Sequence, residues 1–315
     1  MRPQFPHEAS EGAFVRQDDV FRDWVRADGS GRYPAEPNRY HLYVSLACPW
    51  ASRTVIVRAL KGLEAAVSMT VADPIRDDKH GWAFRDVPGA SRDPVNGFAY
   101  LREAYLATDP SYAARVTVPV LWDTRRKRIV SNSDDDIMRM FETEFDEFAD
   151  HPELDLYPER LRDEIDALNA HLYDRVNNGV YLAGFATRQA VYERAAREVF
   201  AVLDELEERL AKRRYLFGAS PVESDWRLFV TLVRFDAVYF GHFKCNLRRI
   251  VDYPNLYGYL RDLYQIPGIA QTVDFDHIKR HYYYTHDEIN PTRIVPIGPM
   301  QDLYAPHGRE KLSRA

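Results

Sequence analysis

The chain has 315 residues, of which 45% are hydrophobic and 29% charged, and its formal net charge is −6 at pH 7. This composition is typical of a globular protein, and the length predicts about two domains. The negative charge gives no electrostatic case for binding nucleic acid or an anionic membrane, and no apolar run is long enough to span a bilayer.

Two features of the sequence indicate a reducing compartment. Residues 1–8 lack the apolar core and cleavage pattern of a secretory signal. Cys48 and Cys245 are the only cysteines, too few for a disulfide framework or a zinc cluster. We therefore expect a cytoplasmic protein without a metal site.

The first half of the chain predicts an α/β domain. Residues 1–39 form an irregular lead segment, and a long polar stretch, 73–94, interrupts the regular elements. The predicted elements are a strand at 40–45, a helix at 51–63, a strand at 68–72, a helix at 98–107, two hairpin strands at 117–123 and 128–131, and a helix at 134–141. This order defines a domain at 40–145.

The second half of the chain predicts only helices. An acidic, proline-marked stretch at 146–160 is interpreted as a linker. Helical periodicity then appears at 161–176, 189–210, 225–239 and 254–264. Residues 161–315 are therefore predicted to form an all-helical domain that ends in an irregular tail.

Cys48 is the first candidate for chemistry. It follows the strand at 40–45 and precedes Pro49, which suits a first helical position. Backbone N–H groups and the dipole of a helix stabilise a thiolate at this point. The alternative is a buried and inert thiol, which is common for free cysteines.

Several motifs in one order resemble a known family. They lie at 12–16, 48–51, 81–82, 115–123, 129–132, 179–186, 234–246, 281–283 and 289–292. A thioredoxin-like N-terminal domain followed by an all-α domain resembles the glutathione transferase fold. The motifs resemble most closely those of the glutathionyl-hydroquinone reductases, or Xi-class glutathione transferases, over about residues 12–298.

The resemblance implies a monothiol reductase. Cys48 would attack the sulfur of an S-glutathionyl-hydroquinone, release the hydroquinone and leave a mixed disulfide for a second thiol to clear. Ala51 stands where a two-cysteine oxidoreductase carries its second cysteine. Pro119 resembles the cis-proline of thioredoxin-like sites, which would turn the backbone of Val118 towards the ligand.

The resemblance also assigns the remaining site residues. Trp82 and the run Arg115, Val116, Thr117 and Val118 would bind the thiol cosubstrate. Tyr181 would handle the quinol proton. Tyr239 and one of three consecutive tyrosines, of which we choose Tyr282 over Tyr283 and Tyr284, would hydrogen-bond the thiolate. The alternative for Trp82 is a loop tryptophan that covers the core, and without the family each tyrosine would be interpreted as a core residue.

One motif departs from the family. Members have Asn-Glu-Ser-Ser where this chain has Asn132, Ser133, Asp134 and Asp135. Ser133 and Asp134 would then contact the thiol cosubstrate, and an aspartate would face its carboxylate with like charge. Either glutathione still binds, or the thiol is a hydroxyl-rich one such as mycothiol; alternatively the aspartates only complement the helix dipole.

The function expected first is reduction of thiol-conjugated hydroquinones, in quinone detoxification or aromatic breakdown, by a homodimer. The alternatives are an omega-like thioltransferase or dehydroascorbate reductase, and a non-catalytic protein with a transferase fold. His242, His281 and His286 are expected to be structural, since their spacing offers no compact metal-ligand set. Cys245 is expected to be inert.

Overall fold

The computed structural model describes residues 9–77 and 79–314. The contacts divide the chain into two compact units. The thioredoxin-like unit comprises Gln17–Leu154 and Gln271–His281, and the helical unit comprises the described residues of Met1–Arg16, Asp155–Ala270 and Tyr282–Ala315. The linear boundaries at 39, 145 and 160 stay a prediction from sequence, and residues 1–8 of the predicted lead segment lie outside the described residues.

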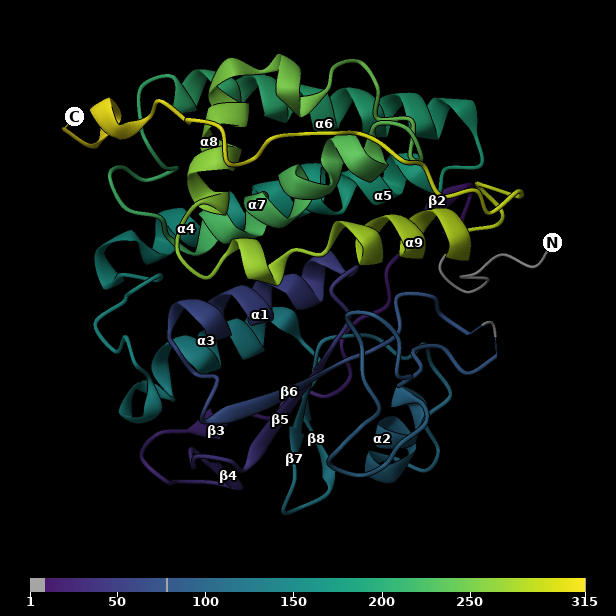
Figure 1. Ribbon diagram of the computed structural model, residues 1–315, viewed down its shortest axis with the longest axis vertical. Helices are drawn as coiled ribbons and strands as arrows, with labels where there is room; N and C mark the ends of the chain where they lie inside the picture. The colour runs from purple at the N-terminus through teal and green to yellow at the C-terminus, as the bar shows by residue number, and fades with distance from the viewer. Residues whose placement is uncertain (1–8, 78, 315) are drawn as a thin grey trace. The chain divides into compact units, whose positions relative to one another are not determined.

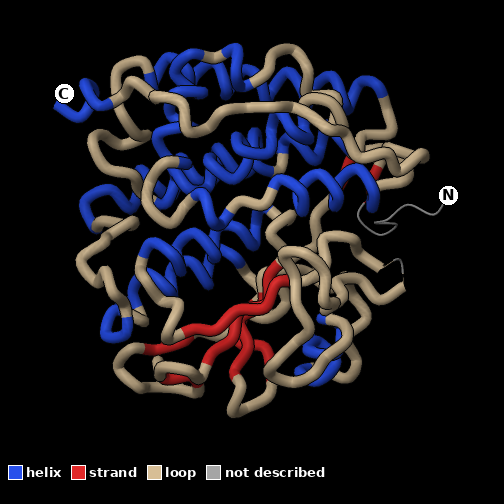
Figure 2. The backbone as a smooth tube through the Cα atoms, viewed as in Figure 1, coloured by secondary structure: helices blue, strands red, loops and turns tan. Residues whose placement is uncertain are grey.

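A four-stranded sheet forms the centre of the thioredoxin-like unit (Figures 1 and 2). Its strands are β5 (Tyr40–Val44), β6 (Val67–Val71), β7 (Val120–Asp123) and β8 (Arg128–Ser131), in the spatial order β6-β5-β7-β8. β5 and β6 are parallel, whereas β7 runs antiparallel to both β5 and β8. Every residue of β5 is buried, as expected for a central strand.

Three helices accompany the sheet: α1 (Pro49–Leu60), α2 (Leu101–Thr108) and α3 (Asp134–Thr143). α1 and α3 pack against each other, and α2 packs against β8. α1 ends where Gly62 adopts a φ of +65°, and a Cβ there would lie 2.5 Å from the Cβ of Asp150. Gly62 therefore suits the end of the helix, which stays short enough for β6 to return beside β5.

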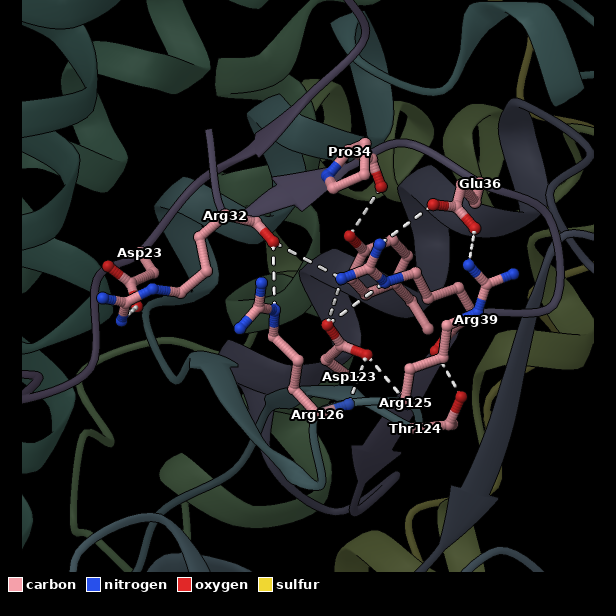
Figure 3. A network of polar contacts seen from close by, with 10 residues as sticks. Asp23, Arg32, Pro34, Glu36, Arg39, Asp123, Thr124, Arg125 and Arg126 are labelled. Carbon is pink, nitrogen blue, oxygen red and sulfur yellow. Dashed lines mark hydrogen bonds and ion pairs between the residues drawn. The ribbon is translucent and has the colours of Figure 1, made fainter. Parts of the chain in front are cut away.

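The described part of the lead segment contains four short strands that the sequence did not predict, and two of them lie in the thioredoxin-like unit. β3 (Val25–Arg26) and β4 (Tyr33–Pro34) form a parallel pair. Behind them, the buried Arg39 guanidinium lies 2.6 Å from the carboxylate of Asp123 at the end of β7, and Glu36 binds both Arg39 and Arg125 (Figure 3). This network fixes the lead segment to the β7–β8 hairpin.

The helical unit contains the remaining long helices. They are α4 (Arg162–Leu172), α5 (Gly179–Gly184), α6 (Gln189–Leu210), α7 (Glu223–Arg234) and α8 (Pro254–Tyr264), with π-helical turns at η3 (Tyr173–Asn177) and η4 (Phe235–Tyr239). α9 (Phe275–Thr285) contributes its residues up to His281 to the thioredoxin-like unit and the rest to the helical unit. A small hairpin of β1 (Ala9–Ser10) and β2 (Ala13–Phe14) also belongs here.

The short helical turns are η1 (Asp146–Phe148), η2 (Glu159–Leu161), η5 (Ile250–Asp252), η6 (Ala270–Thr272) and η7 (Glu310–Arg314). The predicted fold class is confirmed: a thioredoxin-like α/β unit and an all-helical unit. Within the described part of the chain, we find no helix with both the length and the hydropathy needed to cross a bilayer.

Candidate active site

Cys48 lies at the junction of β5 and α1. It is the N-cap residue of α1 with extended backbone angles, and Pro49 occupies the first helical position. Its half-buried Sγ lies 3.7 Å from the carbonyl oxygen of Val118. The positive end of the helix dipole therefore meets the sulfur, and the first turn of α1 carries no acidic residue. This environment favours a negatively charged sulfur.

The peptide bond between Val118 and Pro119 is cis, which confirms the prediction for Pro119. Thr117, just before it, is held from two sides. The Tyr105 hydroxyl donates to the Thr117 carbonyl over 2.9 Å, and the Asn132 side-chain amide donates to Thr117 Oγ1 over 3.1 Å. The backbone that faces Cys48 is therefore fixed in place.

Arg115 and Val116 lead into this segment. The Arg115 carbonyl accepts hydrogen bonds from the Gln17 amide at 2.8 Å and the Tyr112 hydroxyl at 2.7 Å. Val116 is buried. The segment 115–118 thus has a fixed backbone, which is what strand-like pairing with a peptide-like ligand requires.

Ser133 and Asp134 begin α3. Ser133 is its N-cap and accepts a hydrogen bond from the Asp136 N–H over 3.3 Å. The carboxylate of Asp134 receives a hydrogen bond of 2.8 Å from the guanidinium of Arg53, whose side chain is 1% exposed. That guanidinium also lies 4.5 Å from the ring centre of Trp50. The negative charge of Asp134 is therefore neutralised by a buried cation from α1.

Trp82 lies in the loop 73–94 and is 5% exposed. Its indole stacks on the ring of His281, with centroids 5.0 Å apart and planes inclined by 26°. The guanidinium carbon of Arg76 lies 5.3 Å from the indole centre. Trp82 thus belongs to the same unit as Cys48, and its position is set by side chains from the loop itself and from α9.

Three tyrosine hydroxyls meet in the helical unit. They come from Tyr181 on α5, Tyr239 in η4 and Tyr282 on α9. The Tyr282 hydroxyl is hydrogen-bonded to those of Tyr181 and Tyr239, the latter at 3.2 Å. The guanidinium carbon of Arg16 lies 5.0 Å from the ring centre of Tyr181.

Burial keeps Tyr239 and Tyr282 protonated. It raises the pKa of Tyr239 and the pKa of Tyr282 well above the ordinary tyrosine value. Both are completely enclosed, whereas Tyr181 is half-buried. The cluster can therefore donate hydrogen bonds at neutral pH, and Tyr181 is the most accessible of its three members.

The structure distinguishes the three consecutive tyrosines. Tyr283 donates instead to the carbonyl of Ala237 over 3.3 Å, and Tyr284 is 37% exposed beside Arg293. Among 282–284, therefore, Tyr282 is the residue whose hydroxyl joins those of Tyr181 and Tyr239.

The other candidates have structural partners. His242 and His286 are hydrogen-bonded over 3.3 Å, and burial lowers the pKa of His242 to about 4. Cys245 is fully buried, which raises the pKa of its thiol to about 12, so it is a poor nucleophile near neutral pH. Among the described residues, no group of three or more His, Cys, Asp or Glu side chains could hold a metal ion.

The helical unit also contains a cavity of about 520 Å³, lined in part by Asp236, Tyr257, Tyr283 and Met300. The predicted site residues do not occur among the described residues that line it.

Sequence reasoning missed two residues that shape the site. Arg53 carries a charge inside α1, where Pro49–Arg58 are all buried, and a cation in a buried stretch signals a buried partner. The role of His281 had no sequence signal, because its partners lie about 200 residues earlier in the chain.

Two family models match the chain, the glutathione S-transferase N-terminal domain at residues 47–144 and the C-terminal domain at 189–262. The chain belongs to the glutathione transferase family. It is 52% identical to glutathionyl-hydroquinone reductase YqjG of Escherichia coli (strain K12), covering 96% of this chain and 94% of the relative. It is 47% identical to glutathionyl-hydroquinone reductase PcpF of Sphingobium chlorophenolicum, covering 94% of this chain and 93% of the relative.

Solved structures agree. The glutathione-bound structure of YqjG superposes with a TM-score of 0.89 at 54% identity, covering 92% of this chain and 96% of the other. A Xi-class glutathione transferase from Natrialba magadii superposes with a TM-score of 0.90 at 52% identity, covering 93% of this chain and 89% of the other. Within its family, this chain is therefore similar to the Xi-class glutathionyl-hydroquinone reductases, as the motifs predicted.

Proposed function

We propose that this protein is a thiol-dependent reductase of S-conjugated hydroquinones, with Cys48 as its nucleophile. The observation that carries the proposal is the placement of Cys48 at the start of α1, with Sγ 3.7 Å from the carbonyl before cis-Pro119. Two relatives that are 52% and 47% identical over most of the chain are named glutathionyl-hydroquinone reductases.

The reaction transfers two electrons from thiols to the conjugate. The Cys48 thiolate attacks the sulfur of the conjugate, and an S–S bond forms while the bond from sulfur to the aromatic carbon breaks. The electron pair stays on the ring carbon, which takes a proton to give the free hydroquinone. A second thiol then attacks the mixed disulfide, which releases a low-molecular-weight disulfide and restores the Cys48 thiolate.

The tyrosines supply the protons and hydrogen bonds of this scheme. We assign the proton donation to Tyr181, the most accessible of the three hydroxyls. Tyr239 and Tyr282 are assigned to stabilising negative charge on sulfur, because burial keeps both protonated. These roles follow from the family resemblance and from the chemistry of the cluster itself.

Glutathione is the first candidate for the cosubstrate. The like charge of Asp134 argues against glutathione, but the guanidinium of Arg53 lies 2.8 Å from that carboxylate and neutralises it. Mycothiol is the second candidate, because the serine and aspartates at the start of α3 offer acceptors for sugar hydroxyls. Trp82, the segment Arg115–Val118 and the start of α3 are the proposed contacts with either thiol.

A thiol panel tests this proposal. The reduced protein is assayed with the S-glutathionyl and S-mycothiolyl conjugates of one hydroquinone, and with a simple glutathione mixed disulfide. We expect the hydroquinone conjugates to be turned over with a kcat/KM at least about tenfold above that of the mixed disulfide. Preference for the mixed disulfide would identify a thioltransferase instead, and no turnover of any of them would favour a non-catalytic protein.

Two further expectations accompany the function. The protein is proposed to act in the cytoplasm, where its two free cysteines stay reduced. It is also proposed to form homodimers, which light scattering on a size-exclusion column would detect.

A further inference from the structure

We infer that His277 and His281 are positioning residues that hold the loop 73–94, and Trp82 within it, in the shape that binds the thiol cosubstrate. This inference rests on the proposed function. The two histidines lie four residues apart in α9, so they share one face of the helix. Both belong to the part of α9 that forms one compact unit with the loop.

Each histidine donates a hydrogen bond to one end of the loop. His281 Nδ1 lies 2.8 Å from the carbonyl oxygen of Pro74, and His277 Nε2 lies 2.8 Å from the carbonyl oxygen of Pro88. A carbonyl can only accept, so the proton position on each ring is fixed. His281 is 8% exposed and His277 is 1% exposed, so losing either hydrogen bond is costly, because water cannot easily replace it.

His281 also fixes the orientation of Trp82. Its ring stacks on the indole at 5.0 Å while its Nδ1 holds Pro74, so one side chain ties the start of the loop to the tryptophan. With Arg76 also against the indole, only 5% of Trp82 is exposed. The tryptophan therefore has little room to shift without disturbing His281.

Gly89 gives independent evidence of a close fit between loop and helix. Its φ is +76°, and a Cβ at this position would lie 2.5 Å from His277 Nε2 and 2.9 Å from Asp274 Oδ2. The loop backbone thus approaches α9 at a distance that only glycine allows.

The loop depends on such contacts for its shape. Its described residues contain no helix and no strand, only isolated β-bridges such as those of Asp77 with Gly81 and of Val87 with Ala90. A long loop without regular structure takes its conformation from its anchors. The histidines anchor it near both ends, which explains how a loop of this length can present a binding residue.

Variants of the two histidines test the inference. His281→Gln keeps an N–H donor but loses the stacked ring, and His281→Phe keeps a ring but loses the donor. His277→Phe removes the bond to Pro88 together with the contact of Nε2 with Asp274 Oδ2 at 3.8 Å. Arg280→Gln is the matched control, since Arg280 lies on the same helix and its guanidinium lies 3.4 Å from the carboxylate of Asp276, one turn earlier. Hydrogen exchange of the loop amides and the steady-state kinetics of an S-glutathionyl-hydroquinone are measured for each.

We expect the three histidine variants to accelerate exchange in 73–94 while the sheet stays protected. KM should rise about tenfold, the scale of one lost buried hydrogen bond, with kcat within about twofold of wild type. His281→Ala loses both the hydrogen bond and the stacked ring, so its loop exchange and its KM should rise more than those of His281→Gln or His281→Phe. Arg280→Gln should match wild type in both measurements.

The outcomes separate this inference from the proposed function. Unchanged loop exchange in all variants would overturn the inference, as would faster exchange with an unchanged KM. If wild type fails to reduce conjugates, calorimetric titration with glutathione takes the place of KM. In that case, glutathione binding that weakens about tenfold in the histidine variants but not in Arg280→Gln would support the inference even though the proposed function had failed. Glutathione binding that the variants leave unchanged would overturn the inference as well as the proposed function.

Discussion

At the scale of single residues, the hydroxyl of Tyr282 connects Tyr181 and Tyr239, whereas the hydroxyl of its neighbour Tyr283 bonds a backbone carbonyl. We predict that Tyr282→Phe lowers kcat/KM for the conjugate by about 10²-fold, the lower range for a group that assists proton transfer or stabilises charge. Tyr283→Phe is the matched control and should retain activity within about threefold. Equal losses in the two variants would contradict the assignment.

Some of these residues could be predicted from sequence and others could not. The placement of Cys48 at the start of a helix was predictable, because it lies between a strand pattern and Pro49, which suits a first helical position. The cis bond at Pro119 followed from the resemblance alone. The choice of Tyr282 over Tyr283 and Tyr284 also came from the resemblance, because three consecutive tyrosines do not reveal the direction of each side chain from α9.

At the scale of elements, α1 and α3 are joined by the ion pair of Arg53 and Asp134. Because Arg53 is 1% exposed, removing it leaves a poorly solvated carboxylate, so we predict that Arg53→Met costs about 3 kcal/mol of unfolding free energy. In a double-mutant cycle with Asp134→Leu, the two effects should be non-additive by about 1–3 kcal/mol. Urea unfolding measures both.

The control for this cycle is a second ion pair made to α3. Arg22 pairs with Asp136 of α3, but the Arg22 side chain is 58% exposed, so Arg22→Met should cost at most about 1 kcal/mol. Additive effects of Arg53→Met and Asp134→Leu, or a cost for Arg53→Met no larger than that of Arg22→Met, would contradict the role of the buried pair.

The elements themselves were predictable where periodicity is long enough to detect. The seven main elements from β5 to α3, and α6 and α8, appear where the sequence predicts them. α5 has six residues, two of them glycines, which is too short for a 3.6-residue pattern, and each strand of the lead segment has two residues. α9, a helix of 11 residues, was not predicted from sequence.

At the scale of the whole molecule, stability should depend on the buried His41 of the central strand. Both ring nitrogens are hydrogen-bonded, to Ser68 and Thr70, and burial lowers the pKa of His41 to about 4. The unfolded chain, with an ordinary histidine pKa, therefore takes up the proton first as the pH falls from about 6.5 to about 4. Unfolding becomes easier across that window, and the stability linked to the neutral ring is present above it.

We predict that the free energy of unfolding of wild type relative to His41→Gln decreases by up to about 3 kcal/mol between pH 7 and pH 4. Denaturant unfolding at several pH values measures this difference, so that other titrating groups cancel. His151→Gln, at an exposed position, should run parallel to wild type. A constant difference between wild type and His41→Gln would contradict the prediction.

The division into units could not be predicted from sequence. The segment 271–281 belongs to the thioredoxin-like unit although more than 100 residues of the helical unit separate it from Leu154. Periodicity identifies which face of a helix is buried but not which element covers that face. The sequence pattern therefore does not reveal that a late segment of the chain joins an earlier unit.

The proposed reaction depends most on Cys48, and the direct measurement is to trap the mixed disulfide of Cys48. Wild type is mixed with one equivalent of an S-glutathionyl-hydroquinone without added thiol, and the products are analysed by intact mass and peptide mapping. We predict one glutathione adduct on Cys48 with release of one hydroquinone, unchanged in Cys245→Ser and absent in Cys48→Ser. Hydroquinone release by Cys48→Ser, or an adduct at Cys245, would contradict it.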